Sequence, residues 1–198
     1  FSDEVQEIGD ATLTKVSGVQ VEYGGEIFVK FAVPESEALG ILAAIVILVL
    51  AFGSVLAMGL PIGTALLGLG IAVSTVTILS HATLMPDFTT SMVAMVGLGV
   101  GIDYALFIVT RFRQELHAGK SVQDSIAKSL LTSGRSVIFA GITVCISILG
   151  LFSVGISSLR GVAVAAALSV LISMAAAVTL LPALLGIIGH KIDKFSLP

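Results

Sequence analysis

The sequence predicts an all-α integral membrane protein, with a small α/β piece outside the membrane at its N-terminal end. Hydrophobic residues make up 56% of the 198 residues, charged residues only 12%, and the mean hydropathy is +1.10. Charged residues normally supply about a quarter of a water-soluble domain, and a domain of this size could not bury so much apolar surface. The apolar residues also fall into five runs, each near the ~20 residues that a helix needs to cross a bilayer.

Residues 1–36 are the only long polar segment and are predicted to be the end of an extramembrane domain. Ser2 followed by Asp3 and Glu4 favours a helix start, because acidic residues stabilise the N-terminal end of the helix dipole. The alternating pattern at 19–23 indicates a short strand. One helix and one strand cannot form a hydrophobic core, so the rest of this domain is expected upstream.

Five transmembrane helices are expected, at about 37–58, 62–84, 89–110, 137–154 and 161–188. Leu60-Pro61 is predicted to form the turn after the first helix, since proline lacks the N–H group that a helix interior uses. Pro182 is expected to kink or end the last helix for the same reason. Residues 111–135 then form a loop, and 189–198 form a C-terminal tail.

The positive charges predict the orientation of the bundle. Five of the ten Lys and Arg residues lie in the loop 111–135, and Lys191 and Lys194 follow the last helix. Lysine and arginine accumulate on the cytoplasmic side of membrane proteins. Two crossings separate the two clusters, so both can lie on that side. The loop and the C-terminal tail are therefore expected in the cytoplasm, and the N-terminal piece outside.

The basic loop is expected to contain a short amphipathic helix. Ser121 and Asp124 form a capping-box-like helix start. Val122, Ile126 and Leu130 then recur every four residues, which favours a helix lying on the inner membrane surface. Simple packing of a linker and transmission of motion between the third and fourth predicted helices both remain open as roles for this segment.

Small residues predict close helix packing around the third predicted helix. Gly97 and Gly101 form a small-xxx-small pair, and Gly99 lies one turn before Asp103. The last predicted helix is rich in Gly, Ala and Ser. In lipid, such residues let helix backbones approach closely, because packing replaces the hydrophobic effect there.

Asp103 is the residue that most strongly suggests a function. It lies eight residues before Arg111, or about 12 Å along a helix, which places it near the middle of a ~30 Å hydrocarbon core. A carboxylate there costs roughly 2.5–3.5 kcal/mol, and such residues usually face interiors or wet cavities. A structural polar contact, proton or cation binding, and acid catalysis are the three alternatives, with ion coupling favoured. Tyr104 is either a hydrogen-bond donor to this carboxylate or a packing aromatic.

Catalysis and metal binding fit the sequence less well than ion coupling does. Intramembrane aspartyl proteases use two aspartates, one of them in a Gly-x-Gly-Asp motif. Here one extra residue separates Gly101 from Asp103, and no second acid lies in the interior of a predicted span. His81, His117 and His190 are scattered, so no metal-ligand cluster is visible. We therefore expect a protein that is not an enzyme, with no cofactor and with protons as the coupling ion.

Several motifs resemble those of a known family. They are Gly101-Ile102-Asp103-Tyr104-Ala105-Leu106-Phe107, Arg111-Phe112-Arg113-Gln114-Glu115-Leu116, Gly119-Lys120-Ser121, Ser133-Gly134-Arg135 and Leu180-Leu181-Pro182-Ala183-Leu184-Leu185. Together they resemble the MMPL family of the resistance-nodulation-division (RND) superfamily, over about 37–188. Sec accessory transporters and Patched-like proteins share similar logic, but the Asp-Tyr pair and the Leu-Pro-Ala-Leu-Leu motif favour MMPL.

The resemblance implies an RND-type bundle in the bacterial plasma membrane that exports lipids or lipid-like molecules, driven by the proton-motive force. Asp103 and Tyr104 would form half of a proton relay, packed around by Gly97, Gly99 and Gly101. A second repeat of the parent chain would supply the other half, and residues 1–36 would end a porter domain. Membrane lipids, a hydrophobic substrate and a further copy of the chain are the expected partners. A non-transporting scaffold or sterol-sensing-like domain is the alternative, and an intramembrane hydrolase a weaker one.

Overall fold

The computed structural model describes residues 42, 54–81, 83, 85–86 and 88–193. Six α-helices account for most of these residues: α3 (Val55–Ser80), α4 (Thr89–His117), α5 (Val122–Ser129), α6 (Arg135–Leu149), α7 (Ser157–Val178) and α8 (Leu180–Ile188). No strand element occurs in the described part of the chain, so the all-α prediction is confirmed there. The helix and strand predicted within residues 1–36 lie outside the described residues.

Four stretches of the described chain are long and apolar enough to cross a membrane: Ala57–Ser80, Thr89–His117, Val122–Val154 and Ser157–Ile192. The protein is therefore a multi-pass membrane protein. The sequence predicts a fifth span at 37–58, and most of that segment lies outside the described residues. Three short helical turns also occur among the described residues: a π-helical turn at Leu130–Gly134 between α5 and α6, and 3-10 turns at Gly150–Val154 and Gly189–Asp193.

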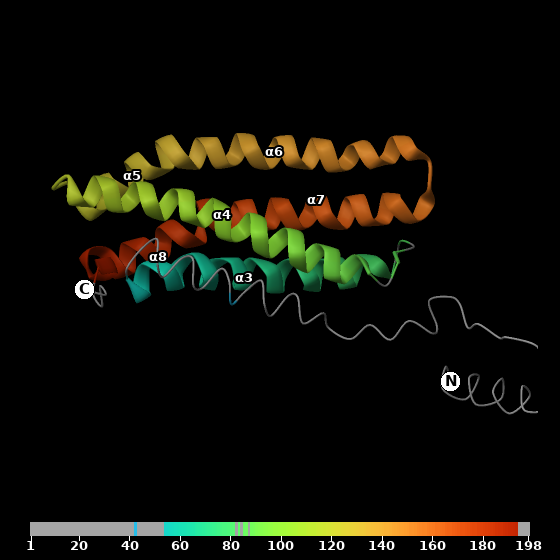
Figure 1. Cartoon of the computed structure of the whole chain (residues 1–198), viewed down its shortest axis with the longest axis horizontal. Helices are drawn as coiled ribbons and strands as arrows, with labels where there is room; N and C mark the ends of the chain where they lie inside the picture. The colour runs from blue at the N-terminus through green and yellow to red at the C-terminus, as the bar shows by residue number, and fades with distance from the viewer. Residues whose placement is uncertain (1–41, 43–53, 82, 84, 87, 194–198) are drawn as a thin grey trace, which may run out of the picture. The chain divides into compact units, whose positions relative to one another are not determined.

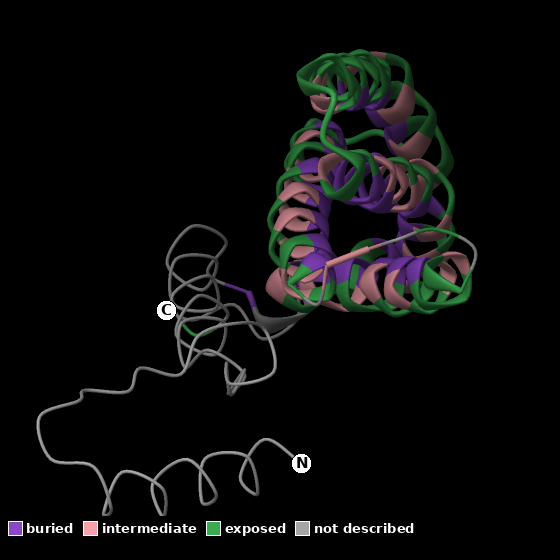
Figure 2. Ribbon diagram, turned by 90° about the vertical axis from the view of Figure 1, so that its right-hand side faces the viewer, coloured by how far each residue is buried: buried purple, intermediate pink, exposed green. Residues whose placement is uncertain are grey.

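Helix α7 is the centre of the described bundle. It packs against α3, α4 and α6. In the membrane-length stretch Ser157–Ile192, which begins with α7, half of the most apolar 18 residues are buried inside the protein. Helix α6 lies at the edge, as Figures 1 and 2 show. In the stretch Val122–Val154, which contains α6, only 17% of the most apolar 18 residues are buried. The outer surface of α6 carries large apolar side chains such as Phe139 and Ile146, as a face toward lipid requires.

The small residues of α7 account for its central position. Its buried residues include Gly161, six alanines, Ser169 and Ser173. The Oγ of Ser169 donates a hydrogen bond to the Val93 carbonyl at 3.1 Å, and the Oγ of Ser173 donates one to the Gly97 carbonyl at 3.0 Å. Both acceptors belong to α4. The two helices thus pack so closely that serine hydroxyls of α7 reach the backbone of α4, as the small-residue pattern predicts.

The predicted turn at Leu60-Pro61 is wrong, because Pro61 lies inside α3. Residues 55–58 accordingly begin the second predicted helix and do not end the first. Proline removes one backbone hydrogen bond, but its fixed φ is compatible with a helix, and transmembrane helices tolerate it where neighbours satisfy the freed groups. Pro61 is fully buried among the neighbouring elements.

The other helix boundaries differ less. Helix α4 continues past Arg111 to His117, and the last predicted helix begins earlier, at Ser157. The chain leaves helical geometry at Thr179, where φ is −118° and ψ is −62°, and α8 then continues to Ile188. Pro182 has no N–H group to bond the carbonyl of Val178, so the helix breaks one turn before this proline, as the sequence predicts.

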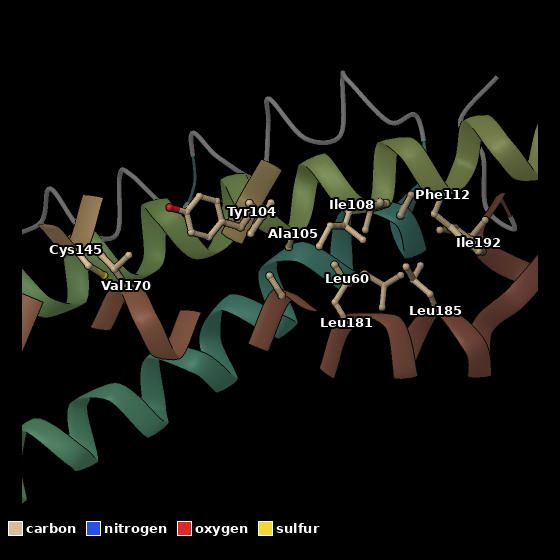
Figure 3. Packing of buried hydrophobic residues seen from close by; sticks show 14 of the residues in the cluster. Leu60, Tyr104, Ala105, Ile108, Phe112, Cys145, Val170, Leu181, Leu185 and Ile192 are labelled. Atoms are coloured by element: carbon tan, nitrogen blue, oxygen red, sulfur yellow. The ribbon is translucent and has the colours of Figure 1, made fainter. Parts of the chain in front are cut away.

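One end of the described bundle holds the basic residues of 111–135 and Lys191, and we call it the basic end. Helix α5 packs against α8 there, and Ile126 and Val122 lie beside Gly186 and Gly189, respectively. The Ser54 Oγ donates to the Ile192 carbonyl at 2.7 Å, which joins the start of α3 to the end of the described chain. Large buried side chains fill the space between these elements (Figure 3); they are Leu60, Ile108, Phe112, Leu181, Leu185 and Ile192.

Candidate functional site

Helix α4 has two different faces, and Asp103 lies on the exposed one. The buried face includes Val93, Gly97, Gly101, Tyr104 and Ile108. The exposed face follows the same three-to-four-residue period and is formed by Met92, Met95, Gly99, Asp103 and Phe107. No described helix covers this face. The carboxylate therefore stands halfway along an apolar helix, on a surface that the described part of the chain leaves open.

Within the described residues, the Asp103 carboxylate receives no hydrogen bond and no ion pair. A lone carboxylate in hydrocarbon is expensive, and intramembrane acids normally pair with another group or line a wet cavity. The described elements supply neither. The Asp103 carboxylate, which can accept a proton or a hydrogen bond, thus lies on a side of α4 where the described bundle offers it no partner.

Tyr104 points in a different direction from Asp103, because successive residues of a helix lie about 100° apart. Its side chain is 8% exposed and belongs to the buried cluster that also contains Cys145 and Val170. Figure 3 shows its ring among these apolar side chains. The structure gives no hydrogen bond between the Tyr104 hydroxyl and the Asp103 carboxylate. In the described part of the chain Tyr104 is a packing aromatic, and the relay role stays a prediction.

The three glycines beside Asp103 fall on the two faces of α4. A Cβ atom at Gly97 would lie 2.3 Å from the Oγ of Ser169, and one at Gly101 would lie 3.2 Å from the Cβ of Ala65. Both glycines therefore allow close packing against α7 and α3. A Cβ at Gly99 would meet nothing within 4 Å. Gly99 accordingly belongs to the open face with Asp103.

Glu115 is a buried acid that the sequence analysis did not single out as a site residue. It is 6% exposed and forms an ion pair with Arg111, with 2.6 Å between Nη2 and Oε1. A second ion pair joins it to Lys120, beyond the end of α4. The spacing of four residues between Arg111 and Glu115 is a known helix-pair signal. The contact with Lys120 could not be read from periodicity, because a turn lies between the two residues.

The predicted amphipathic helix exists as α5. The Ser121 Oγ accepts a hydrogen bond from the backbone N–H of Asp124 at 3.1 Å, so the predicted helix cap is confirmed. Val122 and Ile126 contact the end of α8 and Gly189, so protein covers these two apolar side chains. The fully buried residues of the helix are Ser125 and Ser129, which the apolar pattern did not indicate. This arrangement fits both the packing and the transmission alternatives.

Among the described residues, no group of three or more His, Cys, Asp or Glu could hold a metal ion. Cys145 is buried, and its thiol donates to the Ala167 carbonyl at 3.5 Å. Among the described residues, the charged groups that stand out are therefore Asp103, on the open face of α4, and Glu115 with its two cations at the basic end.

Comparison with known proteins agrees with the sequence motifs. Residues 29–196 match the profile of the MMPL family. The chain belongs to the MMPL family. The match includes α3 to α8 and therefore the whole described bundle, with Asp103 near the middle of the matched region.

Three relatives illustrate the MMPL match. The membrane protein YdfJ of Bacillus subtilis is 42% identical over 89% of this chain and 23% of its own length. The MmpL11 proteins of Mycolicibacterium smegmatis and Mycobacterium tuberculosis H37Rv are 38% and 36% identical, each over 77% of this chain and 16% of its own length. The first MmpL11 is named an exporter of mycolic acid-containing lipids, and the second a heme uptake protein. The chain spans less than a quarter of the length of each relative.

Proposed function

We propose that this chain is part of a bacterial plasma-membrane transporter, driven by the proton-motive force, which exports lipids or lipid-like hydrophobic molecules. Membership of the MMPL family supports the membrane transport class. The names of the two MmpL11 relatives refer to mycolic acid-containing lipids and to heme. Both are largely apolar molecules, and this supports the substrate class.

The observation that carries the proposal is the position of Asp103 on the uncovered face of α4. A membrane-embedded acid is stable only with a partner or with water. In the proposal a second repeat of the parent chain packs on this face and supplies the partner groups, so that Asp103 and Tyr104 form half of a proton relay. The bundle then has a fifth helix at 37–58, and residues 1–36 end a porter domain outside the membrane.

The energy available from protons limits the mechanism. One proton crossing 100 mV supplies about 2.3 kcal/mol. Moving an acyl chain into water costs about 0.8 kcal/mol per methylene, which exceeds that supply for any ordinary lipid. In the proposal, therefore, the substrate follows an apolar route through the porter domain, and protonation of Asp103 only shifts the helices. The basic end faces the cytoplasm, where the proton is released.

The test is an Asp103→Asn substitution in the full-length parent protein, assayed for gradient-dependent lipid export at matched membrane abundance. We expect export to be lost, because asparagine has a similar size but cannot exchange a proton. Asp103→Glu should retain part of the activity. Asp124→Asn is the matched control: it also removes a carboxylate, but one at the start of α5, where asparagine can still accept a hydrogen bond.

Export at the normal rate in the Asp103→Asn protein would contradict the proposal and favour the non-transporting scaffold or sterol-sensing-like domain. The same assay also distinguishes export from uptake. Gradient-dependent uptake of a hydrophobic molecule without export would retain the proton relay but show that the proposed direction is wrong.

A further inference from the structure

The joint between α7 and α8 lacks part of the hydrogen bonding of a continuous helix. At Thr179 the backbone leaves helical geometry, and the threonine hydroxyl donates to the Ala175 carbonyl at 2.6 Å, a contact that often bends helices. Pro182 lacks the N–H group that would bond the Val178 carbonyl. The next bond, from the Ala183 N–H to the Thr179 carbonyl, is long at 3.4 Å. Bending at Thr179 is therefore easier than in the interior of either helix.

Helix α5 packs on α8 at positions where the chain carries glycine. A Cβ atom at Gly186 would lie 3.8 Å from the Cδ1 of Ile126, and one at Gly189, which ends α8, would lie 3.4 Å from a Cγ of Val122. Figure 1 shows both helices at the same end of the bundle. Because glycine has no side chain that could yield, a displacement of α5 acts directly on the backbone at these two positions.

A short turn fixes α5 to the end of α4. The Gly119 N–H donates to the Leu116 carbonyl at 3.0 Å, and the Lys120 N–H donates to the Glu115 carbonyl at 3.3 Å. Gly119 has a φ of +85°, as is usual for the residue that ends a helix. The buried Glu115 carboxylate adds ion pairs with Arg111, on α4, and with Lys120, in the turn. Since α5 also packs against α4, it must follow a movement of the end of that helix.

We propose that Thr179 and Pro182 form a hinge, and that α5 tilts α8 about this hinge when α4 shifts. This motion rests on the proposed function, since its trigger is the protonation of Asp103 on α4. Hinges are a few residues at the ends of elements that absorb changes in φ and ψ. The Ser54 Oγ donates to the Ile192 carbonyl just beyond α8, so α8 tilts in place and does not detach. Helix α5 thus transmits motion, and α8 receives it.

The hinge is tested with Pro182→Ala in the full-length protein. Alanine supplies an N–H group that can bond the Val178 carbonyl, so that α7 and α8 can join into one continuous helix. Pro61→Ala is the matched control, because Pro61 is also a buried proline but lies inside α3, where the helix does not break. The two measurements are hydrogen exchange of the amides of α8 and gradient-dependent transport at matched membrane abundance.

We expect Pro182→Ala to slow hydrogen exchange in α8 about tenfold, as one additional backbone hydrogen bond predicts. Transport should fall by a similar factor, because each bend must now break that bond. Pro61→Ala should transport at the wild-type rate.

Three results would overturn the hinge. Slowed exchange with normal transport would mean that no bend at Thr179 is needed. Unchanged exchange in Pro182→Ala would mean that packing, and not the missing N–H group, causes the break. An equal loss of transport in Pro61→Ala would show that the effect is not specific to this joint.

The link through α5 is tested without a transport assay. Asp103→Asn imitates the protonated acid, and it should change the exchange rates of α8 relative to the wild-type protein while those of α6 stay the same. Combining Val122→Ala with Ile126→Ala should abolish this change, because the side chains that contact α8 are then shortened. No response of α8 to Asp103→Asn, or a response that persists in the alanine variant, would overturn the transmitting role of α5.

A failure of the proposed function would be seen separately. Normal export by the Asp103→Asn protein would reject the proton relay, whereas Pro182→Ala reports on the hinge whatever drives transport. Loss of transport in Pro182→Ala together with normal export in Asp103→Asn would retain the hinge and reject its trigger.

Discussion

Asp103 and Tyr104 are neighbours in sequence but have different surroundings. The carboxylate is exposed on the open face of α4, and the phenol is buried against the bundle. The sequence alone predicts that Asp103 is exceptional, because its depth follows from the distance to Arg111. The direction in which each residue points depends on the side of α4 against which α7 packs. Serine-to-carbonyl contacts set that side, and their partners are far apart in the chain.

Gly97 offers a test of this packing at the scale of one residue. A Cβ at this position would lie 2.3 Å from the Ser169 Oγ, so the hydroxyl must rotate and break its hydrogen bond to the Val93 carbonyl. We expect Gly97→Ala to lower the free energy of unfolding by about 1–2 kcal/mol. The measurement is the thermal unfolding of the purified protein in detergent.

Gly99→Ala and Ser169→Ala complete this experiment. Gly99 is two residues away, and a Cβ there meets nothing within 4 Å in the described chain. In the Ser169→Ala background, Gly97→Ala should cost clearly less, because the clashing oxygen is absent. Equal costs of Gly97→Ala in both backgrounds would mean that the α4–α7 contact differs from the one described.

At the scale of elements, the apolar runs predict the helices well and their ends poorly. Length and hydropathy are sufficient to place α4 and α7. The ends depend on individual backbone hydrogen bonds and on tertiary partners. Pro61 lies inside α3, whereas Pro182 follows a break at Thr179, although both prolines lack the same N–H group. Glu115, held by Arg111 and Lys120, extends α4 beyond the apolar run, and no hydropathy pattern contains that information.

Helix α5 is expected to depend on its cap. It has only eight residues, so packing and the Ser121 cap must replace the stability that a long helix has by itself. Ser121→Ala removes the acceptor for the Asp124 N–H and should destabilise the start of α5 by about 1 kcal/mol. Faster hydrogen exchange of the amides of α5, with α7 unchanged, is the expected result.

Ser136→Ala is the control for the cap, since the Ser136 hydroxyl only donates to a carbonyl of its own helical segment, at Thr132. Its effect on exchange in α5 should be small. If the two variants exchange alike, the packing of Val122 and Ile126 holds α5 without its cap, and the helix belongs to the rigid part of the bundle.

At the scale of the whole molecule, the basic residues of 111–135 and Lys191 lie at the same end of the described bundle, as the count of crossings predicts. The structure shows this through the contact of α5 with α8 and of Ser54 with Ile192. Lys194 lies outside the described residues. Arg160 follows the turn between α6 and α7, at the opposite end. The residues that would pair with Asp103 could not be predicted, because no described element packs on its face.

The orientation of the bundle can be measured by labelling single cysteines from one side of the membrane. The full-length protein is first freed of its own cysteines, including Cys145, and then carries either Lys128→Cys or Arg160→Cys, which are both exposed positions. With the basic end in the cytoplasm, a membrane-impermeant maleimide should label Arg160→Cys in intact cells. It should label Lys128→Cys only after the cells are permeabilised. The opposite pattern would invert the bundle, and Asp103 would then have to release its proton on the outer side, against the proposed direction of coupling.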